Sequence, residues 1–184
     1  VKTNVLGTCN VLQASRKNGV KRVIYSSTSS AYGLANSIPN KEDMPKDCLT
    51  PYSVSKTSGE ELCQMYTKLF GLETVVFRYF NVYGERQPTK GQYAPVIGLF
   101  QRQHAEEKPM TVVGDGFQRR DFTHVSDVVE ANILAAETDK SDVFGEIINI
   151  GFGVSYSIHD IVKLIGGEDA ESICIPERPG ESIE

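Results

Sequence analysis

Apolar residues recur along the chain at two spacings, one typical of amphipathic helices and the other of short buried strands. Helical spacing predicts helices over residues 1–18, 52–70, 96–107, 127–138 and 158–165. β-Branched and apolar runs predict strands over residues 20–25, 74–80, 110–113, 146–150 and 172–175, with a short extended piece over 121–124. Strands that alternate with helices indicate a mostly parallel sheet covered on both faces. The predicted fold class is therefore α/β, doubly wound.

One segment interrupts this alternation. Residues 85–92 read ERQPTKGQ, a cluster of Pro, Gly and polar residues. Such composition is typical of a connection between compact parts. We therefore expect one part over 1–84 and a second over 85–184, with the strand at 146–150 returning to the first sheet.

Composition and charge exclude several classes of protein. The chain has 184 residues, of which 40% are apolar and 23% charged, with a net charge of −5. No basic run could follow a phosphate backbone, no apolar stretch reaches the ~20 residues of a membrane span, and the first residues lack the layout of a signal peptide. We expect a cytoplasmic protein with no nucleic-acid or membrane partner. The four cysteines are scattered without metal-ligand spacing, so neither a disulfide framework nor a metal site is expected.

The strongest local signal is a Tyr followed four residues later by a Lys. Tyr52 and Lys56 lie one helical turn apart at the start of a predicted helix, so they share a face. A nearby ammonium favours the ionised form of a phenol, and a tyrosine in this setting can act as a general acid or base. The alternative is an exposed pair of helix residues with no chemistry.

A hydroxyl cluster lies upstream of this pair. Residues 26–30 read SSTSS directly after a predicted strand, and Thr28 comes 24 residues before Tyr52. Ligands of parallel sheets bind beyond the carboxyl ends of the strands, where a hydroxyl can bond a sugar. The alternative is that Ser and Thr simply form a polar loop. The order of strand, hydroxyl cluster, loop and Y-x-x-x-K helix is more specific than any one part.

Five segments together resemble a known family. They are VIYSSTSSAYG, PYSVSK, RYFNVYG, VGDGFQRRDF and, near the end, RPGE. In this order they resemble the extended short-chain dehydrogenase/reductase superfamily, and within it the NAD-dependent nucleotide-sugar 4-epimerases of the UDP-glucose 4-epimerase type. The resemblance implies a Rossmann-like domain, of which residues 1–84 would be the C-terminal half, and a substrate-binding part within 85–184. It also implies NAD as cofactor and epimerisation at C4 of a UDP-hexose or its N-acetyl analogue through a 4-keto intermediate.

The resemblance assigns catalytic and cofactor-binding roles residue by residue. Tyr52 and Lys56 match the family's catalytic pair, and Thr28 matches the catalytic Ser/Thr position. Asn4, Ser26 and Tyr79 match positions on the nicotinamide side, where Tyr52 and Lys56 also contribute.

The same resemblance assigns substrate contacts. Asn81, Arg120 and Arg178 would hold the UDP diphosphate, Thr28 the sugar 4-oxygen, and Tyr93 and Ala94 would pack near the uracil. An Arg fork bonds phosphate oxygens bidentately. The alternative for each arginine is a surface ion pair, with Asp121 for Arg120 and with Glu177 for Arg178.

One family feature is absent from the sequence. No Gly-rich phosphate loop precedes a helix, and the first strands of the sheet are missing too. We therefore expect the chain to be a segment of a longer, homodimeric enzyme that by itself binds NAD poorly. Ser29 and Ser30 follow Thr28 where dehydratases and decarboxylases of the superfamily resemble T-D-E and T-S-E, which favours epimerisation. Another epimerase, a dehydratase or reductase of the superfamily, or an inactive fragment remain as alternatives.

Overall fold

A computed structural model describes residues 1–91 and 94–176 as two compact units. Unit 1 consists of Val1–Phe80 and Asp127–Ile150, and unit 2 of the described residues within 81–126 and 151–184. The first crossing falls at Phe80, a few residues before the expected boundary at 84. The returning segment is longer than the expected strand, because it includes most of a helix.

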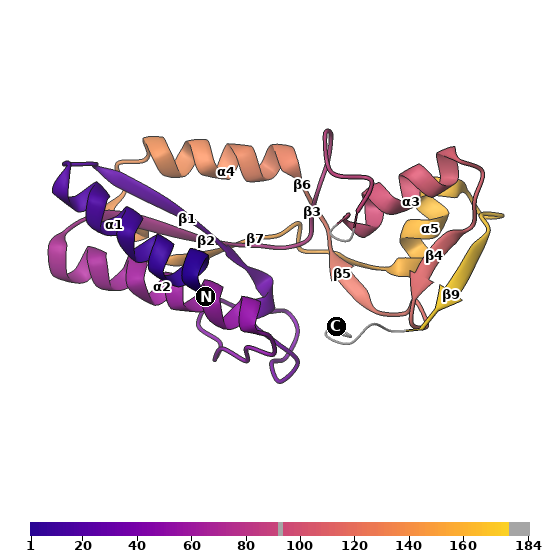
Figure 1. Ribbon diagram of the computed structural model, residues 1–184, viewed down its shortest axis with the longest axis horizontal. Helices are drawn as coiled ribbons and strands as arrows, with labels where there is room; N and C mark the ends of the chain where they lie inside the picture. The colour runs from indigo at the N-terminus through magenta and orange to yellow at the C-terminus, as the bar shows by residue number, and fades with distance from the viewer. Residues whose placement is uncertain (92–93, 177–184) are drawn as a thin grey trace. The chain divides into compact units, whose positions relative to one another are not determined.

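The centre of unit 1 is a three-stranded parallel sheet (Figure 1). Its strands are β1 (Arg22–Thr28), β2 (Glu73–Tyr79) and β7 (Ile147–Ile150), in the order β1-β2-β7. β1 and β2 pair along their whole length, and Thr28 lies opposite Tyr79. The carboxyl ends of these two strands therefore finish side by side at one edge of the sheet.

Helices cover both faces of this sheet (Figure 1). On one face lie α1 (Thr8–Lys17), which continues the π-helical turn Lys2–Gly7, and α2 (Pro51–Phe70). Leu12, Cys63 and Tyr66 of these helices pack against Val76 of β2. On the other face, α4 (Val125–Glu137) packs Ala135 against Val75 and Phe77. Unit 1 thus has the two-sided covering that defines a doubly wound fold.

An ion pair fixes the amino end of the sheet. Arg22 donates from Nε and Nη2 to Glu73 Oε2, its register partner, at 2.9 and 2.7 Å. Its Nη1 also donates to the carbonyls of Ala135 and Ala136, both at 2.7 Å, near the C-terminus of α4. A cation near these carbonyls offsets the negative end of the helix dipole. Arg22 thereby ties α4 to the sheet.

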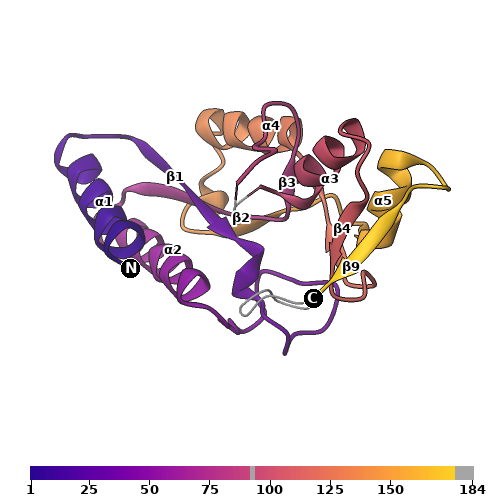
Figure 2. The ribbon, with the colours of Figure 1, turned by 45° about the vertical axis from the view of Figure 1, so that its right-hand side comes forward.

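Unit 2 is built from two helices and three pairs of short strands (Figure 2). β4 (Met110–Val113) pairs with β9 (Ser172–Ile175), and β3 (Val82–Tyr83) with β6 (Thr123–His124), both in parallel. β5 (Arg119–Asp121) pairs with β8 (Ser155–Ser157) in antiparallel fashion. The helices are α3 (Val96–Ala105) and α5 (Ile158–Gly166).

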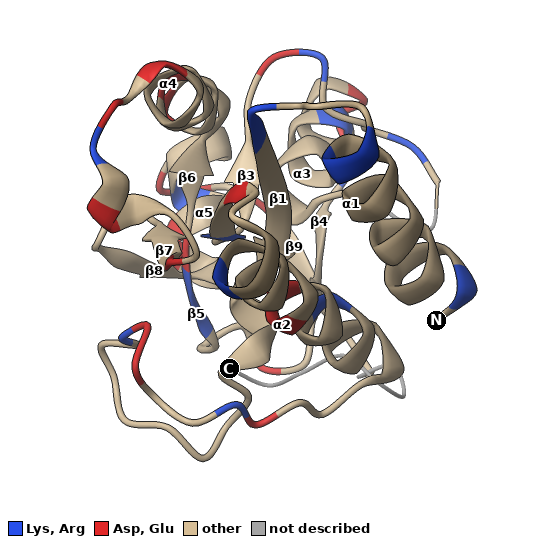
Figure 3. Ribbon diagram, turned by 90° about the vertical axis from the view of Figure 1, so that its left-hand side faces the viewer, with Lys and Arg blue, Asp and Glu red and all other residues tan. Residues whose placement is uncertain are grey.

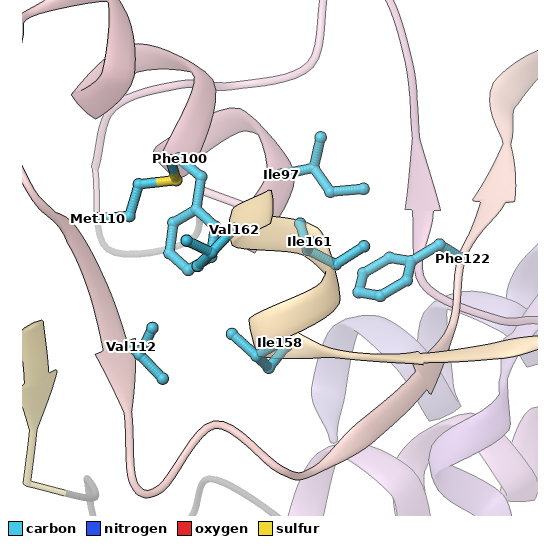
Figure 4. Close-up of a cluster of buried hydrophobic side chains, with 8 residues drawn as sticks. All are labelled: Ile97, Phe100, Met110, Val112, Phe122, Ile158, Ile161 and Val162. Carbon is cyan, nitrogen blue, oxygen red and sulfur yellow. The ribbon is translucent and has the colours of Figure 1, made fainter. Parts of the chain in front are cut away.

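A single apolar cluster holds unit 2 together (Figure 4). It joins α3 and α5 to β4 and to the chain after β5, and its buried members are Ile97, Phe100, Met110, Val112, Phe122, Ile158, Ile161 and Val162. The start of α5 is fixed by reciprocal bonds between Ser157 and Asp160, a capping box that lies directly before the apolar turn.

The predicted fold class is confirmed, and every predicted helix is present. The expectation for residues 26–28 was wrong: β1 continues through Thr28, so these hydroxyls lie in the strand. A buried strand tolerates Ser27 because Glu60 accepts its hydrogen bond. β3 and β8 were not predicted, since two or three residues carry no readable alternation, and the extended piece at 121–124 is two strands, β5 and β6.

Lys and Arg positions and Asp and Glu positions are both scattered over the ribbon in Figure 3. Among the described residues, no helix is long and apolar enough to cross a membrane.

The packing of unit 2 yields a stability prediction. Phe100 is fully buried, whereas Phe117 in the same unit is 72% exposed. We expect Phe100→Ala to lower the free energy of unfolding by about 3–5 kcal/mol, because it leaves a cavity. Phe117→Ala should change it by less than about 1 kcal/mol. Denaturant unfolding, with hydrogen exchange of the amides of α3 and α5, measures both, and equal effects would contradict the assigned core.

Candidate active site

Tyr52 lies at the N-terminus of α2, whose first turn is fixed by local hydrogen bonds. Thr50 Oγ1 accepts the backbone N–H of Ser53 at 3.1 Å, while Ser53 Oγ accepts that of Thr50 at 3.1 Å. Pro51 occupies the first helical turn, where its missing N–H costs nothing. These local bonds begin the helix at one residue. Tyr52 is 52% exposed, and within the described residues its hydroxyl has no hydrogen-bond partner.

Lys56 lies one turn further along α2 and is half-buried. Burial lowers the pKa of its ammonium. Its Nζ lies 4.9 Å from the centre of the Tyr25 ring on β1, and no ion pair or hydrogen bond engages it within the described residues. Tyr25 donates to the Lys56 carbonyl at 3.1 Å, and burial raises the pKa of Tyr25 to about 12. Gly59 allows this approach, because a Cβ there would clash with the Tyr25 hydroxyl.

Asn4 reaches the same stretch of α2 from far away in the sequence. Its Nδ2 donates to Ser55 Oγ at 3.0 Å, and Ser55 immediately precedes Lys56. The Asn4 carbonyl accepts from Thr8 Oγ1 at 2.6 Å, which holds the π-helical turn. The structure therefore brings Asn4 next to the Tyr52–Lys56 turn.

Thr28 and Tyr79 lie side by side at the carboxyl edge of the sheet. The buried Thr28 hydroxyl donates to Ser30 Oγ at 3.1 Å and accepts the Ser30 N–H at 3.2 Å, so it caps the short turn that follows. Ser26, two residues earlier on β1, is exposed. No hydrogen bond joins Thr28 to Tyr52 among the described residues.

The motif spacing did not identify a buried ion pair beneath this edge. Glu60 of α2 and Arg78 of β2 have side chains 0% and 1% exposed. Arg78 Nε and Nη2 donate to the two Glu60 oxygens at 2.9 and 2.8 Å, and Ser27 Oγ donates to Glu60 Oε1 at 2.5 Å. A signal did exist, because a charged residue inside the apolar run TVVFRYF needs a buried partner.

Asn132 is a second residue that the motifs did not indicate. From α4 its Nδ2 donates to Tyr79 Oη at 2.9 Å and to the Val128 carbonyl at 2.7 Å. The hydroxyl of Tyr79 is thus held on the α4 face of the sheet. The only sequence signal is a polar residue within the apolar stripe of the helix.

Two of the substrate candidates are neighbours in unit 2. Asn81 Nδ2 donates to the Asp121 carbonyl at 2.9 Å, and Arg120 precedes Asp121 on β5. Arg120 Nη1 donates to the Arg119 carbonyl at 3.1 Å. The Asp121 carboxylate accepts the backbone N–H groups of Phe152 and Gly153 at 2.8 and 2.7 Å. Asp121 therefore bonds Asn81 through its carbonyl, and the backbone of Phe152 and Gly153 through its carboxylate.

The remaining candidates are placed less fully. Ala94 is half-buried and its N–H donates to the Gly91 carbonyl at 3.3 Å. Tyr93 and Arg178 lie outside the described residues. All four cysteines are free, and within the described residues no group of three or more His, Cys, Asp or Glu could hold a metal ion.

The donors around Lys56 suit the nicotinamide half of a dinucleotide. The half-buried ammonium of Lys56 is unengaged within the described residues, and the Asn4 amide bonds the side chain of the preceding residue, Ser55. An ammonium and an amide match the hydroxyl and carboxamide oxygens of a nicotinamide riboside. No glycine-rich turn that could receive the pyrophosphate is found in the sequence.

Comparison with known proteins defines the class. Residues 1–151 match the NAD-dependent epimerase/dehydratase family. The chain belongs to this family, whose cofactor is NAD, and the predicted superfamily is confirmed.

Individual relatives show which enzymes of this family the chain resembles. A putative UDP-glucose 4-epimerase of Methanocaldococcus jannaschii is 40% identical over an alignment of 182 positions, which covers 97% of this chain and 58% of the relative. A UDP-N-acetyl-α-D-glucosaminuronate decarboxylase of Bacillus cytotoxicus is 41% identical over an alignment of 188 positions, which covers 100% of this chain and 57% of the relative. Among solved structures, UDP-glucuronic acid 4-epimerase from Bacillus cereus, in complex with UDP-glucuronic acid and NAD, superimposes with a TM-score of 0.87 at 38% identity. That match covers 99% of this chain and 57% of the other. The chain thus spans somewhat over half the length of these relatives.

The buried ion pair makes a pH-dependent contribution to stability. Burial by itself raises the pKa of Glu60, but the hydrogen bonds from Arg78 and Ser27 outweigh it, so the pKa lies below its ordinary value of 4.5. A depressed carboxyl pKa stabilises the fold fully above pH ~4.5, and this contribution is lost as the pH falls through the folded-state value. We expect Glu60→Gln to cost about 3–5 kcal/mol at pH 7, because Arg78 loses its countercharge.

The difference between wild type and Glu60→Gln should shrink as the pH drops below about 4.5. Urea unfolding from pH 7 to pH 3 measures it. A difference that stays constant over this range would contradict the depressed pKa.

Proposed function

We propose that this chain carries the catalytic residues of an NAD-dependent 4-epimerase acting on a UDP-hexose, either UDP-glucose and UDP-galactose or their N-acetyl analogues. Family membership and the epimerases among the relatives support the reaction class. The expected homodimeric state and cytoplasmic location remain predictions.

One observation carries the proposal. Among the described residues, an exposed phenol without a hydrogen-bond partner lies at the start of α2, and a half-buried ammonium without a counter-ion lies one turn away. Ammonium groups that serve only stability are usually exposed or paired. A partly desolvated ammonium one helical turn from an exposed phenol is the arrangement expected of an acid/base site.

Each of the proposed active-site residues has its own role in the reaction. Tyr52 takes the proton from the sugar 4-hydroxyl and returns it later, while Thr28 bonds the same oxygen and holds the sugar in line. Lys56 bonds the nicotinamide ribose, and the family resemblance assigns Asn4, Ser26 and Tyr79 to the nicotinamide side as well. NAD, when bound, supplies hydride acceptance and return at C4. The intermediate 4-keto sugar turns its other face before the return, so the configuration at C4 inverts.

Unit 2 supplies the groups that hold the nucleotide. The family resemblance assigns Asn81, Arg120 and Arg178 to the diphosphate and Tyr93 and Ala94 to the uracil. The contact between Asn81 and the Asp121 backbone supports placing Asn81 and Arg120 in one site.

Elimination and decarboxylation are the competing reactions, since a decarboxylase is among the relatives. The residues after Thr28 argue against both. Ser30 occupies the position of the Glu in T-D-E and T-S-E, and its hydroxyl accepts a hydrogen bond from Thr28. Without a carboxyl group there, the acid/base pair for loss of water is missing.

Tyr52→Phe tests the acid/base assignment. The assay uses a protein of its relatives' length that contains this chain, called the full-length protein below. Removing the hydroxyl should lower kcat by about 10²–10⁴-fold, because general acid/base catalysis is lost, while UDP-sugar binding persists. Coupled measurement of UDP-galactose conversion reads kcat.

Tyr66→Phe is the matched control on the same helix. It removes a buried hydroxyl that donates to Gln13 Oε1 at 3.2 Å. It should cost about 1 kcal/mol of stability and leave kcat near wild type. If Tyr52→Phe also kept near-wild-type kcat, Tyr52 would not be the catalytic base.

Arg120→Ala tests the diphosphate site. Loss of a charge-assisted bond should weaken UDP-glucose and UDP-N-acetylglucosamine alike, by about 1.5–3 kcal/mol, because the diphosphate is common to both. Isothermal titration of the full-length protein with each sugar nucleotide measures the change.

The neighbouring Arg119 provides the control. Its guanidinium bonds Ser155 Oγ and the Ser155 carbonyl and lies 3.9 Å from Asp160. Arg119→Ala should therefore leave both dissociation constants close to wild type. A variant of Arg120 that spared one sugar and abolished the other would show that Arg120 contacts the hexose instead.

A further inference from the structure

The fold does not need a buried ion pair at the position of Glu60 and Arg78 in order to be stable. Both side chains are essentially inaccessible, and they join α2 to the middle of the sheet. Desolvation offsets most of the attraction in such pairs, so apolar residues of similar volume often stabilise a core as well or better. The pair therefore calls for an explanation other than stability.

Each member of the network adjoins a residue of the proposed active site. Ser27 precedes Thr28 on β1, Arg78 precedes Tyr79 on β2, and Glu60 follows Lys56 by one helical turn. Side chains alternate across a strand, so a bond that fixes Ser27 toward α2 also fixes the direction of Thr28 on the opposite face. Glu60, which lies on α2 with Tyr52 and Lys56, thus bonds both strands that end in proposed site residues, β1 at Thr28 and β2 at Tyr79.

Further contacts make the carboxylate rigid. Lys46 Nζ lies 3.5 Å from Glu60 Oε2, and the Arg78 guanidinium stacks 4.7 Å from the centre of the Tyr32 ring. Tyr32 in turn donates to Asn149 Oδ1 at 2.7 Å, near the end of β7. A carboxylate held by three partners, Arg78, Ser27 and Lys46, has little rotamer freedom.

Resting on the proposed function, we propose that Glu60 is a positioning residue for the epimerisation. Through its bond to Ser27 and its two bonds to Arg78, Glu60 fixes the position of Thr28 relative to Tyr52 and Lys56. Glu60 touches neither substrate nor cofactor. Its contribution comes from the distance and orientation between the hydroxyl of Thr28 and the phenol of Tyr52. Small errors in such geometry are costly, and a misplacement of about 1 Å can reduce a rate by about 10²-fold.

The chain contains a matched control pair. Arg22 and Glu73 join the same two strands at the opposite end, with comparable bonds of 2.9 and 2.7 Å. Glu73 is not adjacent to any proposed site residue. Glu73→Gln therefore perturbs an ion pair of the same sheet without reaching the carboxyl edge.

The mildest test is Ser27→Ala in the full-length protein, because it leaves the ion pair intact and removes one hydrogen bond. We expect kcat to fall about tenfold, as one charge-assisted bond is lost, with KM and the dissociation constant for UDP-glucose within about twofold of wild type. Glu60→Gln should lower kcat further, by about 10²-fold. Glu73→Gln should keep kcat within about twofold despite its loss of stability.

Hydrogen exchange supplies a readout that needs no turnover. The amides of residues 28–31 should exchange faster in Ser27→Ala and at the wild-type rate in Glu73→Gln. If kcat in all three variants simply followed the loss of stability, or if exchange at 28–31 were unchanged in Ser27→Ala, Glu60 would be a structural residue only.

Two further outcomes are informative. Glu60→Asp keeps the charge but shortens the side chain by one methylene, so full activity in this variant would show that charge alone matters and would overturn the positioning role. A wild-type full-length protein without epimerase activity would refute the proposed function, and the exchange experiment would then decide by itself whether Glu60 orders Thr28.

Discussion

The parallel pairing of β1 with β2 is the constraint on which the rest of unit 1 depends. Because the two strands pair over their whole length in parallel, Thr28 and Tyr79 end at the same edge. Parallel strands also require a long crossover, and α2 provides it, with its N-terminus at that same edge and its C-terminus returning to the start of β2. Tyr52 and Lys56 therefore lie near the carboxyl ends of the strands because of chain topology.

Two kinds of interaction then make this edge specific. Local bonds begin α2 at Thr50, so the position of Tyr52 follows from its immediate neighbours. Long-range bonds set everything else: Asn4 to Ser55, Tyr25 to the Lys56 carbonyl, and Glu60 to Ser27 and Arg78. The apolar clusters on the two faces supply most of the stabilisation, since burial of apolar area dominates folding. The polar hydrogen bonds then favour one arrangement of strands and helices over the others that apolar packing alone would permit.

Unit 2 follows the same logic with shorter elements. Its apolar cluster joins two helices to β4, while the strands that carry the proposed nucleotide contacts are only two or three residues long. Such short strands are stabilised by side-chain bonds to the backbone, as Asn81 and Asp121 show. A binding surface built from irregular segments on a packed support can vary its contacts without altering the core.

The sequence by itself determined the class of fold, the five helices, the longer strands and the motif residues of the candidate site, because apolar periodicity and helix caps are local properties. It also indicated that Tyr52 and Lys56 share a helix face. Only the tertiary structure decided that the hydroxyls of residues 26–28 belong to β1. It also decided that Asn132 donates to the Tyr79 hydroxyl and that Glu60 is the counter-ion of Arg78. Those facts depend on contacts between residues from 18 to 53 positions apart. No local pattern specifies such a partner, because the choice is made by which side chains the packed sheet and helices bring within hydrogen-bond distance.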